Sequence, residues 1–317
     1  SMDHQIWRGS NSREFFVLSH SLKFNKNWGV PMISLKRFYN ALTSFQNQPN
    51  REQRQAIDSQ ADENLFVVAG PGSGKTTVLT LRVLKLILVD GVNPVEIVAT
   101  TFTKKAAAEL RSRILGRGFT LIETLIKDDK TTKKQKEWLQ NLDINQVKTG
   151  TIDSICEQLL RDFRQPGFLP PILADEFITQ TLLLNEGMFA SDLYRNSDYY
   201  EFVADIRGRY QAGAISTKTS ILNDIWNRRY NDQVDWESYL NDPTQSTSEL
   251  SLREAIDQGL ENYDQALKER GMLDFTLLEQ EVLDRLRDGR LKEFTDGLSV
   301  LLVDEYQDTN LLQESIY

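Results

Sequence analysis

Residues 69–76 read AGPGSGKT and lie between an apolar run at 65–68 and a helix-like pattern at 77–89. Glycine tolerates positive φ and carries no Cβ, so Gly70, Gly72 and Gly74 allow the backbone to curl its amide groups around an anion. The start of a helix also favours an anion, because the helix dipole is positive there. A strand, a glycine-rich loop and a helix in this order predict a phosphate-binding loop in an α/β fold.

The polar side chains of this loop are suited to holding a nucleoside triphosphate. Lys75 is placed to reach the β- and γ-phosphates, and the Thr76 hydroxyl is placed to coordinate Mg²⁺. The strict pattern G-x-x-x-x-G-K-[ST] has glycine where this chain has Ala69, a small departure because Gly70 follows at once. The expected nucleotide contacts are Ala69, Gly70, Pro71, Gly72, Ser73, Gly74, Lys75, Thr76 and Thr77.

A second apolar run, at residues 300–303, ends in Asp304 and Glu305. Mg²⁺ keeps several waters and takes one or two carboxylates besides the nucleotide, so Asp304 is the expected metal ligand. Glu305 is then placed to orient and deprotonate the attacking water. An ordinary exposed strand end is the alternative interpretation of this acidic pair. The guanine-selecting sequence Asn-Lys-x-Asp does not occur, which disfavours a GTPase.

The rest of the chain alternates between short apolar runs and helical patterns. The expected strands are 65–69, 96–102, 147–152 and 298–304. The helices expected after the first three are 76–89, 104–115 and 154–163. This alternation is typical of a parallel sheet with helices on both faces.

Two stretches interrupt the alternation. Residues 116–146 are rich in lysine and are expected to be partly loop, whereas 165–270 contain helical patterns, a surface loop at 241–251 and no convincing strand. We therefore expect an all-helical subdomain inserted in the α/β domain, with the aromatic residues between 194 and 236 in its core. The expected parts are an N-terminal extension of unknown role at 1–45, a nucleotide-binding lobe at 46–164, the helical insertion at 165–270 and the rest of the lobe at 271–317.

Charge is distributed unevenly along these 317 residues. The net charge is −9, yet residues 104–136 hold ten basic and four acidic side chains, whereas 223–317 hold nine and twenty-two. The basic segment permits local phosphate contacts, although a solvated lysine-rich loop explains it equally well. Apolar stretches fall short of the ~20 residues that cross a bilayer, and Cys156 as the only cysteine fits a reducing compartment. We expect a cytoplasmic protein with no membrane partner.

Several segments resemble the superfamily-one DNA helicases of the UvrD/Rep/PcrA type, over roughly residues 47–317. They are NREQRQA at 50–56, TFTKKAAAEL at 101–110, GTIDSIC at 150–156, GMLDF at 271–275 and LVDEYQDTN at 302–310. The resemblance implies the first RecA-like lobe of such an enzyme, a P-loop NTPase fold. Ile152 and Asp153 stand where the family usually has Phe-His, and the added negative charge disfavours a DNA contact by Asp153 itself.

The resemblance also implies roles that residue chemistry alone leaves open. Gln53 is implied to pair with the adenine edge, as an amide side chain can. Gln307 is implied to lie near the γ-phosphate and to join Lys75, Asp304 and Glu305 in catalysis. Contacts to single-stranded DNA are implied for Phe102, Thr103, Lys104 and Thr151.

The implied activity is ATP- and Mg²⁺-dependent movement along single-stranded DNA in the 3′-to-5′ sense, with duplex unwinding and a use such as DNA repair. The family's second RecA-like lobe would follow Tyr317, so we expect an N-terminal fragment that binds ATP weakly and turns it over very slowly. Two alternatives stay open, the helicase part of a helicase–nuclease of the AddA/RecB kind and an ATP-dependent module that binds single strands without unwinding. The oligomeric state is also open.

Overall fold

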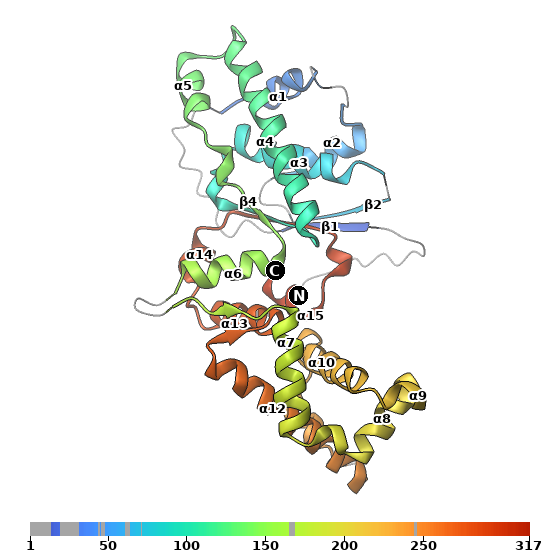
Figure 1. Cartoon of the computed structure of the whole chain (residues 1–317). Coiled ribbons are helices and arrows are strands. Elements are labelled where there is room, and N and C mark those ends of the chain that lie inside the picture. The colour runs from blue at the N-terminus through green and yellow to red at the C-terminus, as the bar shows by residue number, and fades with distance from the viewer. Residues whose placement is uncertain are drawn as a thin grey trace. The chain divides into compact units, whose positions relative to one another are not determined.

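The computed structural model describes residues 14–19, 32–43, 45, 48–60, 64–70, 72–164, 169–243 and 246–317. The chain divides into two compact units (Figure 1). The first contains the chain up to Ile155 together with 292–309, and the second contains 156–291 together with 310–317. The domain boundaries expected from the sequence, at 165 and 270, remain a prediction. In the part of the chain described here, no helix has both the length and the apolar content needed to cross a membrane.

A five-stranded sheet organises the described residues of the first unit, in the order β2-β1-β7-β3-β4. Its strands are β1 (Glu14–Ser19), β2 (Leu65–Ala69), β3 (Ile97–Thr100), β4 (Lys148–Gly150) and β7 (Val300–Asp304). Strands β7, β3 and β4 pair in parallel. Because β1 pairs antiparallel with both β2 and β7, those two strands also run in one direction. The predicted parallel sheet is confirmed, with β1 as an added antiparallel strand.

Part of this unit comes from residues that the sequence analysis placed in an extension. β1 (EFFVLS) is rich in residue types that favour strands. Helix α1 (Leu35–Leu42) brings Phe38 and Leu42 into the hydrophobic core together with Ile33. The apolar spacing at 35, 38 and 42 is that of a helix with one buried face, so these residues contribute to the core rather than lying outside it.

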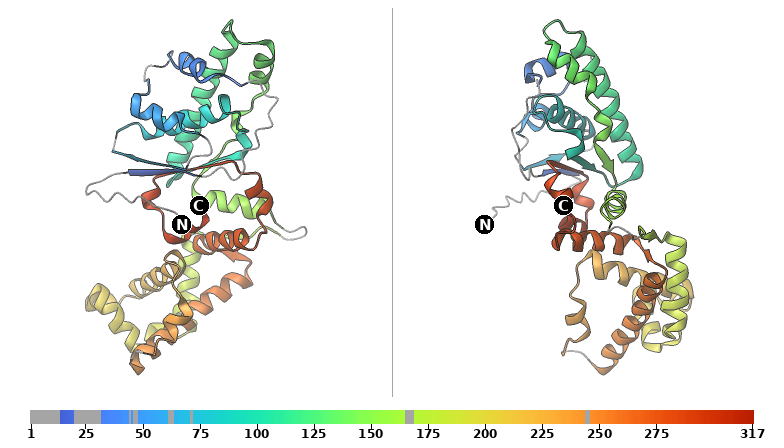
Figure 2. Two further views of the ribbon diagram at one scale, coloured as in Figure 1. Left: turned by 180° about the vertical axis from the view of Figure 1, so that it is seen from behind. Right: turned by 90° about the vertical axis from the view of Figure 1, so that its left-hand side faces the viewer.

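Helices α1, α2 (Arg51–Asp58), α3 (Lys75–Leu88), α4 (Lys104–Lys127) and α5 (Lys133–Asn141) lie on one side of the sheet (Figures 1 and 2). The short α14 (Lys292–Asp296) lies on the other side, where Phe294 is 5.4 Å from Lys148 Nζ of β4. The rest of the predicted cover on that second face remains a prediction.

Helix α3 is buried on nearly all sides, including two cationic residues, Arg82 and Lys85. Arg82 donates to the carbonyl oxygens of Ile57 at 2.9 Å and Gln60 at 2.7 Å, and Lys85 pairs with Asp90 at 2.7 Å. Carbonyls at the end of a helix lack intrahelical donors and carry partial negative charge. These cations therefore bind the end of α2 to α3, the helix that follows the glycine-rich loop.

The expected loop at 116–146 is wrong for most of its length. Helix α4 continues to Lys127, and α5 covers Lys133–Asn141. Gly118 lies inside α4, where a Cβ would meet Ile144 Cδ1 at 2.5 Å and Leu84 Cδ2 at 3.0 Å. The glycine permits close packing of α4 on α3, so it does not mark the end of a helix here.

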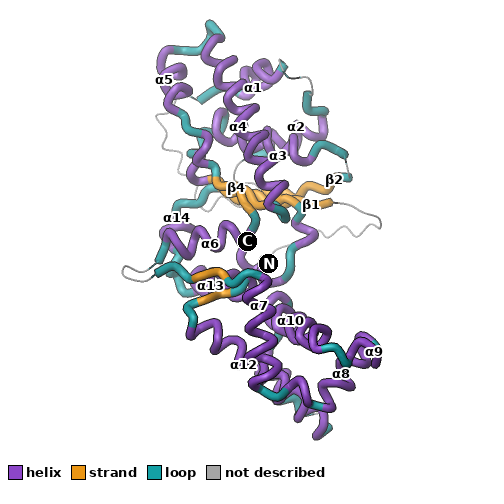
Figure 3. Tube along the Cα trace, viewed as in Figure 1, coloured by secondary structure: helices purple, strands orange, loops and turns teal. Residues whose placement is uncertain are grey.

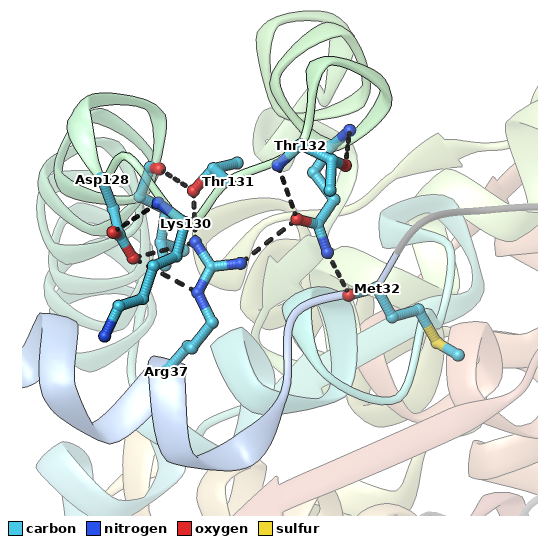
Figure 4. Close-up of polar contacts among 8 residues, drawn as sticks. Met32, Arg37, Asp128, Lys130, Thr131 and Thr132 are labelled. Carbon is cyan, nitrogen blue, oxygen red and sulfur yellow. Dashed lines mark hydrogen bonds and ion pairs between the residues drawn. The ribbon is translucent and has the colours of Figure 1, made fainter.

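The connection between α4 and α5 is held by a side chain from α1 (Figure 4). Arg37 Nη2 donates to Asp128 Oδ2 at 2.9 Å, and Arg37 Nη1 donates to Gln135 Oε1 at 3.1 Å. Gln135 Nε2 in turn donates to the Met32 carbonyl at 2.8 Å. Residues 32–42 and the lysine-rich segment therefore form one structural unit, although about ninety residues separate them.

The second unit is almost entirely helical (Figure 3). Helix α6 (Ile152–Asp162) leads into it from the first unit. Its other helices are α7 (Glu176–Leu182), η3 (Leu183–Ala190), η4 (Leu193–Arg195), α8 (Ser197–Arg207), α9 (Arg209–Ala212), α10 (Ile215–Asn231), α11 (Trp236–Leu240), α12 (Thr247–Glu269), α13 (Phe275–Arg287) and α15 (Leu311–Ile316).

Two expectations for this unit need correction. A short parallel pair, β5 (Ile172–Leu173) and β6 (Met272–Leu273), lies where no strand was expected in 165–270, because two residues are too few to show a period. The loop expected at 241–251 ends early, since Ser246 and Glu249 form a capping box that starts α12 at Thr247.

Aromatic side chains form the core of the second unit around one buried carboxylate. Trp226 Nε1 donates to Asp274 Oδ2 at 2.7 Å, and the Tyr263 hydroxyl donates to the same oxygen at 2.8 Å. Asp274 also caps α13, accepting from Leu277 N at 2.8 Å. Burial raises the pKa of Asp274. Of the aromatic residues expected in this core, Tyr210 is the exception, with 99% of its surface exposed.

Replacing Asp274 by alanine should lower the free energy of unfolding by roughly 3 kcal/mol, because each buried donor left without an acceptor costs about 1–3 kcal/mol. The D274N variant keeps one acceptor oxygen and should lose less. Since the pKa is raised, ionisation opposes folding, and stability should fall as pH rises through the folded-state pKa in the wild type but not in D274N. Urea unfolding at several pH values measures both effects. Equal losses for the two variants would contradict this role.

Candidate nucleotide-binding site

The carboxyl ends of β2, β7, β3 and β4 meet at one edge of the sheet. Phe16 of β1 is level with Val67 of β2 on one side and with Asp304 of β7 on the other. Neighbouring strands lie about 4.8 Å apart, so β2 and β7 are separated by roughly 10 Å. Ligands of open α/β sheets bind at the carboxyl ends of the strands. The glycine-rich loop after β2 and the acidic pair after β7 thus lie at the same edge.

The loop turns from β2 into α3 through glycines in the left-handed region. Gly72 has φ of 74°, and Gly74, the N-cap of α3, has φ of 84°. The Gly74 carbonyl accepts from Thr77 N at 2.9 Å and Val78 N at 3.0 Å, which fixes the start of the helix at Lys75. The first N–H groups of a helix have no intrahelical acceptor and point out from its start. The loop therefore has the backbone form that a phosphate requires, and Pro71 lies outside the described residues.

Gln53 lies against this loop through both ends of its amide. Its Oε1 accepts from Asn50 N at 2.9 Å in the capping box of α2, and its Nε2 donates to the Ser73 carbonyl at 2.7 Å. A Cβ at Gly74 would approach Gln53 Nε2 to 2.9 Å. The spacing of Asn50 and Gln53 is a capping-box signal that the sequence analysis did not use. Gln53 thus fixes α2 to the loop, and the adenine contact stays a prediction.

The acidic pair has an unusual backbone. Glu305 has φ of 59°, and its N–H donates to Asp304 Oδ1 at 3.1 Å. A non-glycine residue in this region costs about 1–2 kcal/mol and recurs at functional sites. The turn η5 (Tyr306–Asp308) follows, and Tyr306 packs edge-on against Phe66 of β2 with ring centroids 6.3 Å apart. That contact joins the turn after β7 to the strand before the glycine-rich loop.

The residues expected to bind a metal have suitable chemistry. A carboxylate at Asp304 and a hydroxyl at Thr76 are hard oxygen ligands of the kind Mg²⁺ takes, with phosphate oxygens and waters completing the octahedron. Among the residues described, no group of three or more His, Cys, Asp or Glu side chains could hold a metal without a nucleotide. Gln307 is exposed, and its Nε2 donates to Asp308 Oδ2 at 3.1 Å.

The residues expected to contact DNA follow β3 and β4, whose ends are joined by Thr101 N donating to the Gly150 carbonyl at 3.0 Å. Phe102 is 59% exposed, and Lys104 is exposed at the start of α4. Thr103 is exposed and caps α4 by accepting from Ala106 N at 3.1 Å. Thr151 is only 6% exposed, and its hydroxyl accepts from Ser154 N at 3.3 Å.

Burial therefore separates these four residues. Phe102, Thr103 and Lys104 offer their side chains to solvent, whereas the Thr151 hydroxyl serves the start of α6. Contact with DNA remains a prediction for all four, and the geometry favours the segment after β3.

Comparison with known proteins gives a consistent result. A model of the UvrD/REP helicase N-terminal domain family matches residues 49–317. A probable DNA helicase of Mycoplasma pneumoniae is 30% identical over 266 residues, which is 83% of this chain and 42% of that protein. The ATP-dependent DNA helicase UvrD1 of Mycobacterium tuberculosis is 29% identical over 268 residues, 83% of this chain and 29% of its own length.

A second kind of relative matches a shorter stretch. An ATP-dependent helicase/nuclease of Lactobacillus acidophilus is 39% identical over 142 residues, 44% of this chain and 11% of that protein. The chain spans less than half the length of each of these relatives.

Proposed function

Because the chain belongs to the family of UvrD/REP helicase N-terminal domains, we propose that it is the ATP-binding part of a DNA helicase that moves 3′ to 5′ along single strands. The observation that carries the proposal is the common strand edge, to which the register with Phe16 assigns both the loop after β2 and the pair Asp304 and Glu305. A triphosphate on the loop would reach the carboxylates across one intervening strand.

Each residue of this edge has a task in the proposed reaction. The loop amides and Lys75 bind and orient the phosphates, while Thr76 and Asp304 hold Mg²⁺, which supplies positive charge to the phosphate oxygens when bound. Glu305 orients the attacking water and accepts its proton. Gln307, two residues further along the same turn, lies in the segment whose position can respond to the γ-phosphate.

The proposal also covers what lies beyond this chain. We propose that a second RecA-like lobe follows in the full-length protein and supplies arginine to the ATP site, an addition worth about 10³–10⁵-fold in rate in related phosphoryl transfer. The chain by itself should then bind ATP weakly and hydrolyse it very slowly. A use in DNA repair and a cytoplasmic location are part of the same proposal, while the oligomeric state stays open.

Unwinding of tailed duplexes by the protein with both lobes tests this function. ATP-dependent strand separation should require a 3′ single-stranded tail and should fail on a duplex with only a 5′ tail. Separation from the 5′ tail would reverse the proposed direction. ATP-dependent binding without separation of either duplex would favour a binding module that grips single strands.

Phe102→Ala should weaken binding to a single-stranded oligonucleotide by roughly 5- to 100-fold, because stacking of one base on an aromatic ring is worth about 1–3 kcal/mol. ATP binding should not change. Phe119→Ala is the matched control, since Phe119 is 53% exposed on α4 away from the strand edge. Fluorescence anisotropy of a labelled oligothymidine measures both variants, and equal affinities would remove Phe102 from the DNA site.

A second candidate rests on the helicase/nuclease relatives, of which the one from Lactobacillus acidophilus shares 39% identity with 142 residues of this chain. In that case the same ATP-binding unit would serve a protein that also cuts DNA. Release of nucleotides from linear duplex DNA by the full-length protein, in the presence of ATP, would support this candidate. Unwinding without cleavage would favour the simple helicase.

A further inference from the structure

The acidic pair continues along the chain through a tightly bonded turn. Glu305 holds its left-handed backbone at the start of η5, and its carbonyl accepts from Asp308 N at 2.9 Å. The Tyr306 carbonyl accepts from Thr309 N at 3.1 Å and from Thr309 Oγ1 at 2.7 Å. These bonds leave little slack between the carboxylates and the next helix.

That next helix, α15, belongs to the second unit, and the chain passes between the units after residue 309. Gln313 Nε2 donates to Glu279 Oε1 of α13 at 2.8 Å, and Glu279 is 3% exposed. Gln233, just after α10, donates through Nε2 to the Leu311 carbonyl at 2.9 Å and to Ser315 Oγ at 2.5 Å. Two helices of the second unit thus hold α15 from both of its ends.

Backbone strain marks the two ends of this connection. Among the described residues, three other than glycine have positive φ, and they are Asp192, Gln233 at 48° and Glu305 at 59°. Such residues cost about 1–2 kcal/mol each and persist only where their surroundings hold them. One of them begins the turn after the acidic pair, and another holds α15 in place.

We propose that α15 is a mechanical link through which the nucleotide state of the ATP site reaches the helical unit, with Gln233, Glu279 and Gln313 as its positioning residues. The inference rests on the proposed function, because it takes Glu305 and its turn to respond to the γ-phosphate. A displacement of the turn must move α15, since the hydrogen-bonded segment joins them, and α15 in turn acts on α10 and α13 through these side chains. Coupling requires an element whose state both sites influence, and α15 meets that requirement.

Hydrogen exchange of this chain with and without a non-hydrolysable ATP analogue and Mg²⁺ tests the link. In the wild type, exchange should slow at residues 72–77 and should change by about fivefold or more in α15 and at the end of α10, the lower end of typical couplings. In Gln233→Ala, the change at 72–77 should persist, while the nucleotide-dependent change at the end of α10 should fall below about twofold. Gln280→Ala is the control, because Gln280 bonds only Asp284 of its own helix, at 2.9 Å.

The outcomes separate this inference from the proposed function. Protection at 72–77 without any change in α15 would overturn the link and leave the ATP site intact. Absence of protection at 72–77 in the wild type would overturn both. A Gln233→Ala variant that still transmits the nucleotide signal like Gln280→Ala would remove Gln233 from the link, and urea unfolding of both variants shows whether either has lost its fold.

Discussion

Glu305→Gln should lower ATP turnover by roughly 10²–10⁴-fold, the usual contribution of a general base, while ATP and DNA binding stay intact. Glutamine has the length and shape of glutamate, and it accepts the same strained backbone conformation, but its amide cannot take a proton from water. The backbone bond from residue 305 to Asp304 Oδ1 does not involve the side chain, so the metal ligand should keep its position.

Phosphate release in the presence of single-stranded DNA measures this effect in the protein with both lobes. Glu293→Gln, on α14 of the same unit, is the matched control and should hydrolyse ATP normally. Turnover retained in Glu305→Gln would assign the base to another group. Loss of ATP binding in that variant would show that the carboxylate serves the ground state instead.

Lys75→Ala should weaken ATP binding and lower turnover, together by about 10²–10³-fold, the cost of removing one preorganised group that stabilises developing charge. Lys75 is the first residue of α3, directly after the glycine that fixes the helix start. Its ammonium therefore adds to the favourable end of the helix dipole at the point where the phosphates are expected.

Titration with a fluorescent ATP analogue measures the affinity. Lys36→Ala removes an equal charge from an exposed position on α1 and should leave the affinity unchanged. Lys75→Arg should recover part of the binding and little of the rate, because a planar guanidinium does not reproduce the point charge of lysine. Equal affinity of Lys75→Ala and the wild type would refute the phosphate site.

The strands and the ends of the site could be predicted because their signals are local. The apolar runs at 65–69 and 298–304 have a strand's length and stop at a glycine loop and an acidic pair. The helix α4 was predicted too short, because Gly116 and Gly118 have the chemistry of a helix end in isolation. Only the packing of Gly118 against Ile144 and Leu84 reveals that its missing side chain makes room for a neighbour.

Side chains with more than one possible use show the same limit. Thr151 and Gln53 were assigned to ligands because their groups can bind them, yet the structure uses the Thr151 hydroxyl and the Gln53 amide to fix helix starts and the glycine-rich loop. Asp274 stood in a recognisable segment, but its role as acceptor for Trp226 and Tyr263 depends on residues 48 and 11 positions away.

The sequence by itself determined the glycine-rich loop with Lys75 and Thr76, the acidic pair and the helicase family, because covalent order and short-range periodicity are written directly in the chain. Tertiary structure alone decided that β1 separates β2 from β7, that residues 33–42 enter the core and that α15 is held by Gln233 and Glu279. Those features depend on which surfaces exclude water together and which donors find acceptors across long loops, and no local pattern carries that information.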